Sequence, residues 1–265
     1  MTFAHANGRE PIHQPTLPVF EDEAAWVQAA AERFEHATAE QLLAWALAQF
    51  HPRLAISAAG GVDGLAIIDM AWRIDPAVRV FTLDTGRLPR ETHALIAEVR
   101  KRYGLAIDVF TPWPDTVGAF VEQYGIDGFY EGVEQRKSCC AVRKVEPLRR
   151  ALAGKRGWIT GLRREQAESR ATLVEAEQDP VQGKWKFSPL AEWSAEDVWA
   201  YLRANKVPYN KLHDRGYPSV GCDPCTRAIK PGEHPRAGRW WWEQDAARKE
   251  CGLHEIPIRV LEKMA

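Results

Sequence analysis

The sequence has no feature that would place the protein in a membrane, in a secreted disulfide framework or on a nucleic acid. No apolar run reaches the roughly 18 residues that a membrane-spanning helix needs. The formal net charge is only −1, with 35 Lys and Arg residues against 36 Asp and Glu residues, so no overall field attracts nucleic acid. The five cysteines are an odd number, and no signal peptide is visible. We therefore expect a cytoplasmic protein in a reducing compartment, where the cysteines stay thiols.

The sequence also lacks internal repeats and low-complexity tracts. Its composition, with 45% hydrophobic and 27% charged residues, is that of an ordinary globular protein. Periodicity is weak at both ends, because prolines interrupt the first 20 residues and the segment after Cys225 is rich in Pro, Gly and Trp. We predict a loose N-terminal arm over 1–22, a nucleotide-binding domain over 23–228 and a C-terminal segment over 229–265.

Between these ends, short apolar runs alternate with amphipathic stretches, which predicts an α/β fold with a doubly wound, mostly parallel sheet. The predicted strands span 54–57, 78–83, 106–110 and 157–162. The predicted helices span 21–34, 38–50, 65–74, 91–104, 142–154 and 194–207. Two of these helices begin with N-cap signals, Thr38 with Gln41 and Ser194 with Asp197.

Four of the cysteines form two pairs, which predicts a metal centre. Cys139 and Cys140 are adjacent, and Cys222 and Cys225 have a C-x-x-C spacing. Two pairs of thiolates suit a zinc ion or an iron–sulfur cluster. Because neighbouring side chains diverge, an adjacent pair strains one small tetrahedral ion, whereas a cubane offers two separate iron atoms. The spacing favours a cluster and leaves structural zinc as the alternative.

The fifth cysteine, Cys251, has no partner thiol near it in the sequence. Its neighbours include Arg248, Lys249 and His254. Cations lower the pKa of a thiol, and the thiolate is the reactive form. This setting indicates a nucleophile, and the alternative is a buried or incidental thiol. A metal centre and a lone nucleophilic thiol together suggest redox chemistry on a small substrate.

A candidate anion site follows the first predicted strand. The loop SAAGGVDG contains Ser57, Gly60 and Gly61, and its small residues let backbone N–H groups and a helix N-terminus approach an anion closely. The spacing resembles the S-G-G-x-D-S loop of ATP pyrophosphatases, although both serines of that pattern are absent. The loop therefore suits one phosphate or sulfate, and the alternative is an ordinary strand-to-helix turn.

A set of motifs carries a resemblance to one family. It comprises the loop at 57–63, LDTGRL at 83–88, CCAVRKVEPL at 139–148, GCDPCTR at 221–227, GRWWWE at 238–243 and KECGLH at 249–254. With these motifs in this order, residues 40–256 resemble the assimilatory adenylylsulfate reductases, the cluster-containing branch of the phosphoadenylylsulfate reductase family. The resemblance implies an adenine nucleotide α-hydrolase-like fold of the ATP-pyrophosphatase type.

The resemblance also assigns roles to individual residues. Cys251 would attack the sulfur of adenylylsulfate, and His254 belongs to the same catalytic motif. The ligands of a 4Fe–4S cluster would be Cys139, Cys140, Cys222 and Cys225. The residues that would bind the substrate are Ser57, Gly60, Gly61, Asp84, Thr85, Gly86, Arg87, Lys144, Arg170, Arg236 and Arg239.

The implied activity is reduction of adenylylsulfate to sulfite and AMP in sulfate assimilation, by an oxidoreductase acting on a sulfur group with a disulfide as acceptor. Attack by Cys251 would give an S-sulfocysteine, and a second thiol would release sulfite from it. Because four of the five cysteines are committed to the cluster, we expect thioredoxin or a related dithiol protein as partner. No nucleic-acid or membrane partner is implied, and a homo-oligomer stays open.

The loop departs from the family pattern at two positions, Ala59 where serine is usual and Val62 where an acidic residue is usual. Losing one hydrogen bond to a charged group costs about 1.5–3 kcal/mol, which weakens binding without changing the reaction. Three other functions stay open: a reductase that prefers phosphoadenylylsulfate, a sulfur-transfer or thiolation enzyme, and a non-catalytic iron–sulfur sensor. The cluster cysteines oppose the first, the missing serines and the E-C-G-L-H motif oppose the second, and Cys251 opposes the third.

Overall fold

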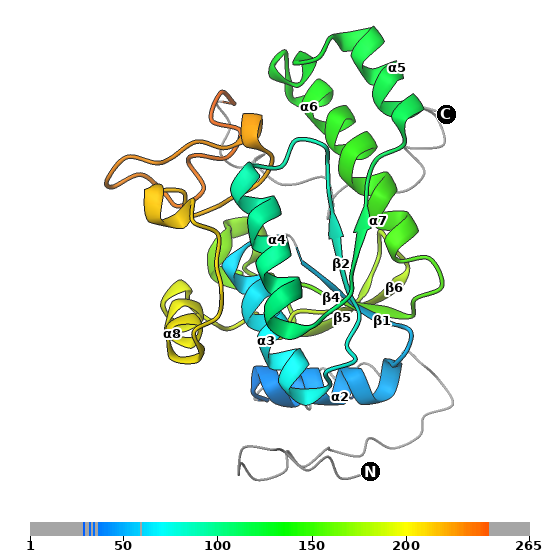
Figure 1. The fold of residues 1–265 in the computed structure, drawn as a ribbon, viewed down its shortest axis with the longest axis vertical. Coiled ribbons are helices and arrows are strands. Elements are labelled where there is room, and N and C mark those ends of the chain that lie inside the picture. Colours follow the sequence, from blue (N-terminus) through cyan, green and yellow to red (C-terminus); the bar gives the residue numbers. More distant parts are fainter. Residues whose placement is uncertain (1–28, 30–31, 33, 35–36, 59, 244–265) are drawn as a thin grey trace.

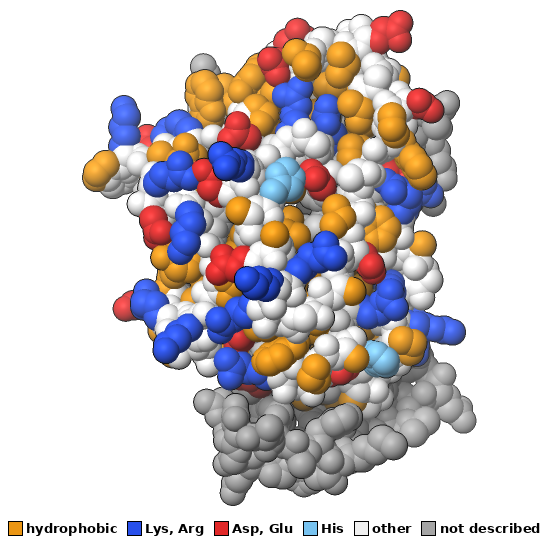
Figure 2. All heavy atoms as spheres, in the orientation of Figure 1, with side chains coloured by type: hydrophobic (Ala, Val, Ile, Leu, Met, Phe, Trp, Pro, Cys, Tyr) orange, Lys and Arg blue, Asp and Glu red, His pale blue; other side chains and the backbone are white. Residues whose placement is uncertain are grey.

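The computed structural model describes residues 29, 32, 34, 37–58 and 60–243. The predicted arm at 1–22, most of the helix predicted at 21–34, Ala59, Cys251 and His254 lie outside these residues. Among the described residues, no helix combines the length and the apolar character needed to cross a membrane. Figure 2 shows acidic and basic side chains interspersed over one face of the molecule, in keeping with the small net charge.

The described chain forms a six-stranded sheet between helices (Figure 1). The strands are β1 (Leu54–Ser57), β2 (Val80–Leu83), β3 (Ile107–Phe110), β4 (Gly157–Ile159), β5 (Ala176–Asp179) and β6 (Lys184–Phe187). Their order is β3-β2-β1-β4-β6-β5, and every neighbouring pair is parallel except β5 with β6. The chain winds outward from β1 in one direction and then in the other, so the predicted doubly wound, mostly parallel sheet is confirmed.

The α-helices are α2 (Ala39–Phe50), α3 (Val62–Ile74), α4 (Arg90–Tyr103), α5 (Pro114–Tyr124), α6 (Val133–Cys140), α7 (Glu146–Ala151) and α8 (Ala195–Asn205). The predicted N-caps are confirmed, since the hydroxyls of Thr38 and Ser194 each accept a backbone N–H of the first turn. Helices α5 and α6 and the β5–β6 hairpin have no counterpart in the prediction. In α5 the residues Val117, Phe120, Val121 and Tyr124 recur at helical spacing, so the sequence did contain a signal for this helix, whereas the buried face of α6 includes an arginine and shows no apolar stripe.

Alternation along the strands separates two hydrophobic cores. Ile56 of β1 and Ile159 of β4 belong to the larger core, together with residues of α2, α3, α4 and α8. Their neighbours Ala55 and Trp158 point to the opposite face and pack with residues of α7. Both faces of the sheet are thus covered at β1 and β4, which explains why these two strands read as apolar runs.

The parallel strands direct their following loops to one edge of the sheet. β1 pairs with both β2 and β4, so the carboxyl ends of these strands lie side by side. The chain leaves them through the loop at 57–61, the motif at 84–87 and the segment at 160–166. Ligands of open parallel sheets bind at this edge. The fold therefore brings the predicted anion loop and the predicted nucleotide motif together.

A buried carboxylate joins three of the helices on one face. Asp69 of α3 is 1% exposed and accepts hydrogen bonds from the Tyr103 hydroxyl of α4 at 2.9 Å and the Tyr201 hydroxyl of α8 at 2.8 Å. It also accepts from the Arg73 guanidinium at 2.7 Å. One charged acceptor thus serves three donors from separate parts of the helical layer.

Replacing this carboxylate should be costly. We expect Asp69→Asn to lower the free energy of unfolding by about 2–4 kcal/mol, because buried donors lose a charged acceptor. Asp108→Asn is the matched control, since its ion pair with Arg79 is exposed and 3.5 Å long, and it should cost at most about 1 kcal/mol. Urea denaturation of the two variants measures the difference. Equal losses would show that the Asp69 network adds nothing to stability.

Candidate active site and metal centre

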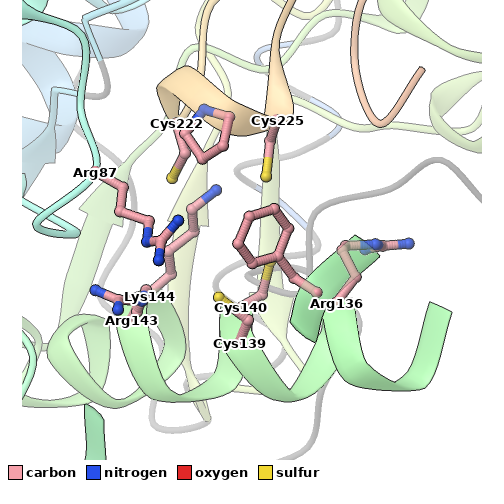
Figure 3. Close-up of a pocket in the computed structure, with 10 residues that line it drawn as sticks. Arg87, Arg136, Cys139, Cys140, Arg143, Lys144, Cys222 and Cys225 are labelled. Atoms are coloured by element: carbon pink, nitrogen blue, oxygen red, sulfur yellow. The ribbon is translucent and has the colours of Figure 1, made fainter. Parts of the chain in front are cut away.

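Four cysteine thiols from two distant segments line one pocket (Figure 3). Cys139 and Cys140 are the last residues of α6. Cys222 and Cys225 begin and end a tight turn that contains the short helix η6 (Asp223–Cys225). All four side chains are buried, and in Figure 3 the two pairs face each other across the pocket. The structure thus brings together the four cysteines that the sequence grouped.

The helix that carries the first pair changes its geometry directly after it. α6 ends at Cys140 and continues through a π-helical turn, η2 (Ala141–Val145), into α7. Such turns widen a helix and are frequent at functional sites. Arg143 and Lys144 of this turn line the same pocket, and in Figure 3 the Lys144 side chain extends toward the turn that carries Cys222.

Hydrogen bonds connect the cysteine pocket to the motif after β2. Thr85 Oγ1 lies 3.2 Å from the sulfur of Cys222, and the Arg143 guanidinium donates to the Thr85 carbonyl oxygen at 2.8 Å. The backbone N–H of Asp223 donates to the Arg87 carbonyl oxygen at 2.8 Å, and the Arg87 side chain lines the pocket. The candidate metal centre and the candidate nucleotide motif are therefore parts of one site.

Burial controls the protonation of the thiols. It raises the pKa of Cys139, against the effect of the nearby Arg143 guanidinium, and it raises the pKa of Cys225 to about 12. These free thiols are therefore protonated at neutral pH. A metal centre would displace the protons, and the negative charge of the thiolates would then lie beside Arg87, Arg143 and Lys144.

Two further observations test which metal centre the pocket fits. The indole Nε1 of Trp240 is buried in the same cluster as three of the cysteines and has no hydrogen-bond partner among the described residues. Buried donors without a partner are rare, and inorganic sulfide would supply an acceptor. Within the described ranges, no group of three or more His, Cys, Asp and Glu side chains is close enough together to hold a metal ion as it stands. The Trp240 indole thus suits a centre that carries inorganic sulfide, and the four cysteine thiols are the residues that would hold such a centre.

The predicted anion loop meets α3 without a side-chain cap. Gly61 is the N-cap residue, so no side chain occupies the N–H groups of the first turn. Gly60 has φ +73°, a conformation that favours glycine, and a Cβ there would lie 3.0 Å from the Thr92 methyl group. Asp63 of the first turn accepts from the Arg163 guanidinium at 2.6 Å, which ties the loop to the segment after β4.

The motif after β2 is shaped by its own carboxylate. Asp84 accepts the backbone N–H of Gly86 at 2.9 Å and lies 3.0 Å from Nε2 of His93. Gly86 has φ +68°, a conformation that favours glycine, and its hydrogen bond to Asp84 holds the turn in this shape. This turn directs Thr85 and Arg87 toward the cysteines, while Ser57 stays half-buried at the end of β1.

The predicted arginines divide between two places. Arg239 is buried, and its guanidinium lies 4.8 Å from the ring centroid of Trp240. Its positive charge opposes the rise that burial causes in the pKa of Cys225. Arg236 is half-buried and lies 5.9 Å from the same ring. Arg170 instead donates to the side chain of Gln166 in the segment after β4. The structure therefore gathers Arg236 and Arg239 near the cysteines and places Arg170 at another loop of the same sheet edge.

Two charged residues of the pocket have no role in the sequence prediction. Arg143 adjoins Lys144 in the basic motif after the cysteine pair, so the sequence did contain a signal for it. Arg136 is fully buried, and its ion-pair partner Glu243 lies 107 residues further along the chain. No local pattern announces a contact of that kind.

The chain is similar to known proteins over most of its length. Residues 53–228 match the Phosphoadenosine phosphosulfate reductase domain. The adenosine 5′-phosphosulfate reductase of Burkholderia cepacia is 58% identical over 181 residues, which cover 68% of this chain and 72% of that protein. The protein of the same name from Allochromatium vinosum is 53% identical over 194 residues, covering 73% of this chain and 75% of that protein.

A solved structure supports the fold. The phosphoadenylyl-sulfate reductase of Candida auris, in a phosphate complex, superposes with a TM-score of 0.66 at 27% sequence identity. The superposition covers 81% of this chain and all of that chain. The predicted fold class is thereby confirmed.

Proposed function

Because the chain belongs to the phosphoadenosine phosphosulfate reductase family, we propose that it reduces adenylylsulfate to sulfite and AMP in sulfate assimilation. The observation that carries the proposal is the four-cysteine pocket joined to the motif after β2. It occurs in a chain that is 53% and 58% identical to relatives named adenosine 5′-phosphosulfate reductase. The activity is that of an oxidoreductase acting on a sulfur group.

The chemistry begins with a thiolate. In adenylylsulfate, sulfate and AMP form a mixed anhydride, so the sulfur is open to attack and AMP is a good leaving group. Cys251 forms a bond to this sulfur while the bond between the sulfur and the phosphate oxygen breaks, which gives S-sulfocysteine and AMP. A second thiol then attacks the Cys251 sulfur, and sulfite leaves with the electron pair of the broken sulfur–sulfur bond. His254 lies in the same motif as the nucleophile.

Cations must neutralise the anionic substrate before a thiolate can approach it. Lys144, Arg87 and Arg239 lie around the cysteine pocket, and an arginine can bind phosphate or sulfate with two parallel hydrogen bonds. The N–H groups at the start of α3 suit the nucleotide phosphate. Arg236, which lies near the Trp240 ring, and Arg170, in the segment after β4, would bind the remaining anionic groups of the substrate.

We assign the four buried cysteines to a 4Fe–4S cluster as its ligands. Trp240 Nε1 and the Thr85 hydroxyl are suited to donate hydrogen bonds to sulfur atoms of this centre. When bound, the cluster would supply fixed charge and structural order, and it is not required to carry electrons in the thiol chemistry. Around it, Lys144 and Arg143 bind and orient anionic groups.

The electrons come from a partner. With four cysteines in the metal centre, Cys251 is the one remaining thiol of the chain, so reduction needs an external dithiol. Thioredoxin or a related protein fits this requirement, and the chemistry suits the reducing cytoplasm. In this arrangement the domain at 23–228 binds the nucleotide and the segment at 229–265 brings the nucleophile.

The test is sulfite release from adenylylsulfate and from its 3′-phosphorylated form, with thioredoxin present. We expect kcat/KM to be at least about tenfold higher for adenylylsulfate, because the loop at 57–61 suits few anionic groups. Omitting thioredoxin is the control and should stop sulfite release. A preference for the 3′-phosphorylated form would indicate a phosphoadenylylsulfate reductase. No sulfite from either nucleotide, with the metal centre intact, would favour the sensor hypothesis.

A further inference from the structure

A buried ion pair connects the helix of the cysteine pair to the last described residues of the chain. The guanidinium of Arg136 in α6 donates to both carboxylate oxygens of Glu243, through Nε at 2.8 Å and through Nη2 at 3.2 Å. The two side chains are 1% and 4% exposed. This pair is far more deeply buried than the neighbouring bidentate pair of Arg227 and Glu233, whose side chains are 36% and 30% exposed.

The ion pair is one of several contacts that attach residues 238–243 to α6 and to the turn that carries Cys225. The Arg136 guanidinium also lies 4.6 Å from the ring centroid of Trp240, and the Arg239 guanidinium lies 4.8 Å from the same ring. The backbone N–H of Trp240 donates to the Cys225 carbonyl oxygen at 3.1 Å. Trp240 has φ +44°, a strained conformation for a residue other than glycine. Such strain persists only where the surroundings hold the residue firmly.

The orientation of Arg136 shows that its charge is directed to Glu243 and not to the four cysteines. It lies three and four residues before Cys139 and Cys140, on the face of α6 that lines the pocket. In Figure 3, however, its guanidinium points away from the four sulfur atoms. A buried guanidinium without a carboxylate is strongly unfavourable. Arg136 therefore holds Glu243 against α6, the helix that carries Cys139 and Cys140. Eight residues after Glu243 comes Cys251.

We infer that Glu243 is a positioning residue, which fixes the start of the nucleophile-bearing segment on the helix that carries Cys139 and Cys140. The inference rests on the proposed function of Cys251. Through its ion pair with Arg136, Glu243 holds the chain at position 243 on α6, and its proposed effect on Cys251 is exerted through the residues that follow. Loss of the pair should therefore slow the thiol step without weakening nucleotide binding.

The experiment measures sulfonation of Cys251 in a single turnover, with adenylylsulfate and without thioredoxin. We expect Glu243→Gln to lower this rate about 10- to 100-fold, as small misplacements of a reacting group do. Its iron content and its affinity for AMP should equal those of the wild type. Glu233→Gln is the matched control, because it removes one partner of the exposed bidentate pair, and it should react at the wild-type rate.

Glu243→Asp provides a second variant if Glu243→Gln does not fold. It retains the charge but shortens the side chain, so it should be sulfonated more slowly than the wild type and the Glu233→Gln control while its iron content and AMP affinity stay those of the wild type. Wild-type rates in a folded Glu243 variant would overturn the inference alone, as would a loss of rate that merely follows a loss of iron or of AMP binding. A wild-type protein that is not sulfonated at Cys251 would overturn the proposed function and this inference with it.

Discussion

Replacing Cys251 with serine is expected to lower sulfite release by about a thousandfold or more, as removal of a covalent nucleophile does in other enzymes. A serine hydroxyl is a much weaker nucleophile than a thiolate at neutral pH. A sulfate ester on serine would also have oxygen in place of the cysteine sulfur, so the second thiol would find no sulfur–sulfur bond to cleave and no sulfite could leave with its electron pair. The variant should retain the metal centre, since its four proposed ligands lie at other positions. It should also bind adenylylsulfate, because the anion-binding residues are unchanged.

Sulfite release, iron content and nucleotide binding of the same preparation measure these three expectations. Iron and binding serve as the internal controls, because they separate loss of the nucleophile from loss of the fold. A Cys251→Ser protein that still turns over adenylylsulfate would show that another residue performs the attack. Loss of iron together with activity would instead mean that Cys251 belongs to the metal centre.

Cys140→Ser should remove most of the iron and destabilise the protein. Cys140 is 5% exposed, and bound metal contributes to folding, so a missing ligand affects both properties. Ser138→Ala is the matched control, two residues earlier on the same helix. The Ser138 hydroxyl is buried and has no hydrogen-bond partner among the described residues, so its removal should change neither iron nor stability appreciably.

Metal and acid-labile sulfide analysis of anaerobically purified protein measures this effect. The wild type should hold about four irons per chain with a similar amount of sulfide. One zinc and no sulfide would contradict the cluster and support the structural-zinc alternative. Full iron in the Cys140→Ser variant would mean that the adjacent cysteine pair is not needed as two ligands.

The sheet could be predicted from the sequence because its strands are short and continuously apolar. Runs such as LAIS give a strong local signal, and the alternation of strands with amphipathic helices fixes the parallel connection. The antiparallel β5–β6 hairpin gave no such signal, because AEQD is largely polar and KWKF alternates lysines with aromatic residues instead of forming an apolar run. β5 is the edge strand of the sheet and pairs with β6 alone.

Part of the site could be predicted for a different reason. Cysteines are rare in this chain, so the spacing of Cys139, Cys140, Cys222 and Cys225 was informative without any knowledge of the fold. The structure places Arg87 and Lys144, which the motifs suggested, in the same pocket. The roles of Cys251 and His254 stay predictions, since both lie outside the described residues.

Other features of the site depend on contacts between distant parts of the chain. α6 carries the first cysteine pair, yet its sequence VEQRKSCC has no apolar stripe, because its buried face includes Arg136. That arginine is tolerated in the interior because Glu243 compensates its charge. A partner 107 residues away cannot be read from local periodicity.

The most direct test of the central claim is the mass of the peptide that contains Cys251 after the wild-type protein reacts with adenylylsulfate in the absence of thioredoxin. The account predicts one added SO3 group on Cys251, one equivalent of AMP released, and loss of the added mass, with release of sulfite, when thioredoxin is supplied. An unmodified Cys251, or an added SO3 group on any other residue while AMP is released, would contradict it.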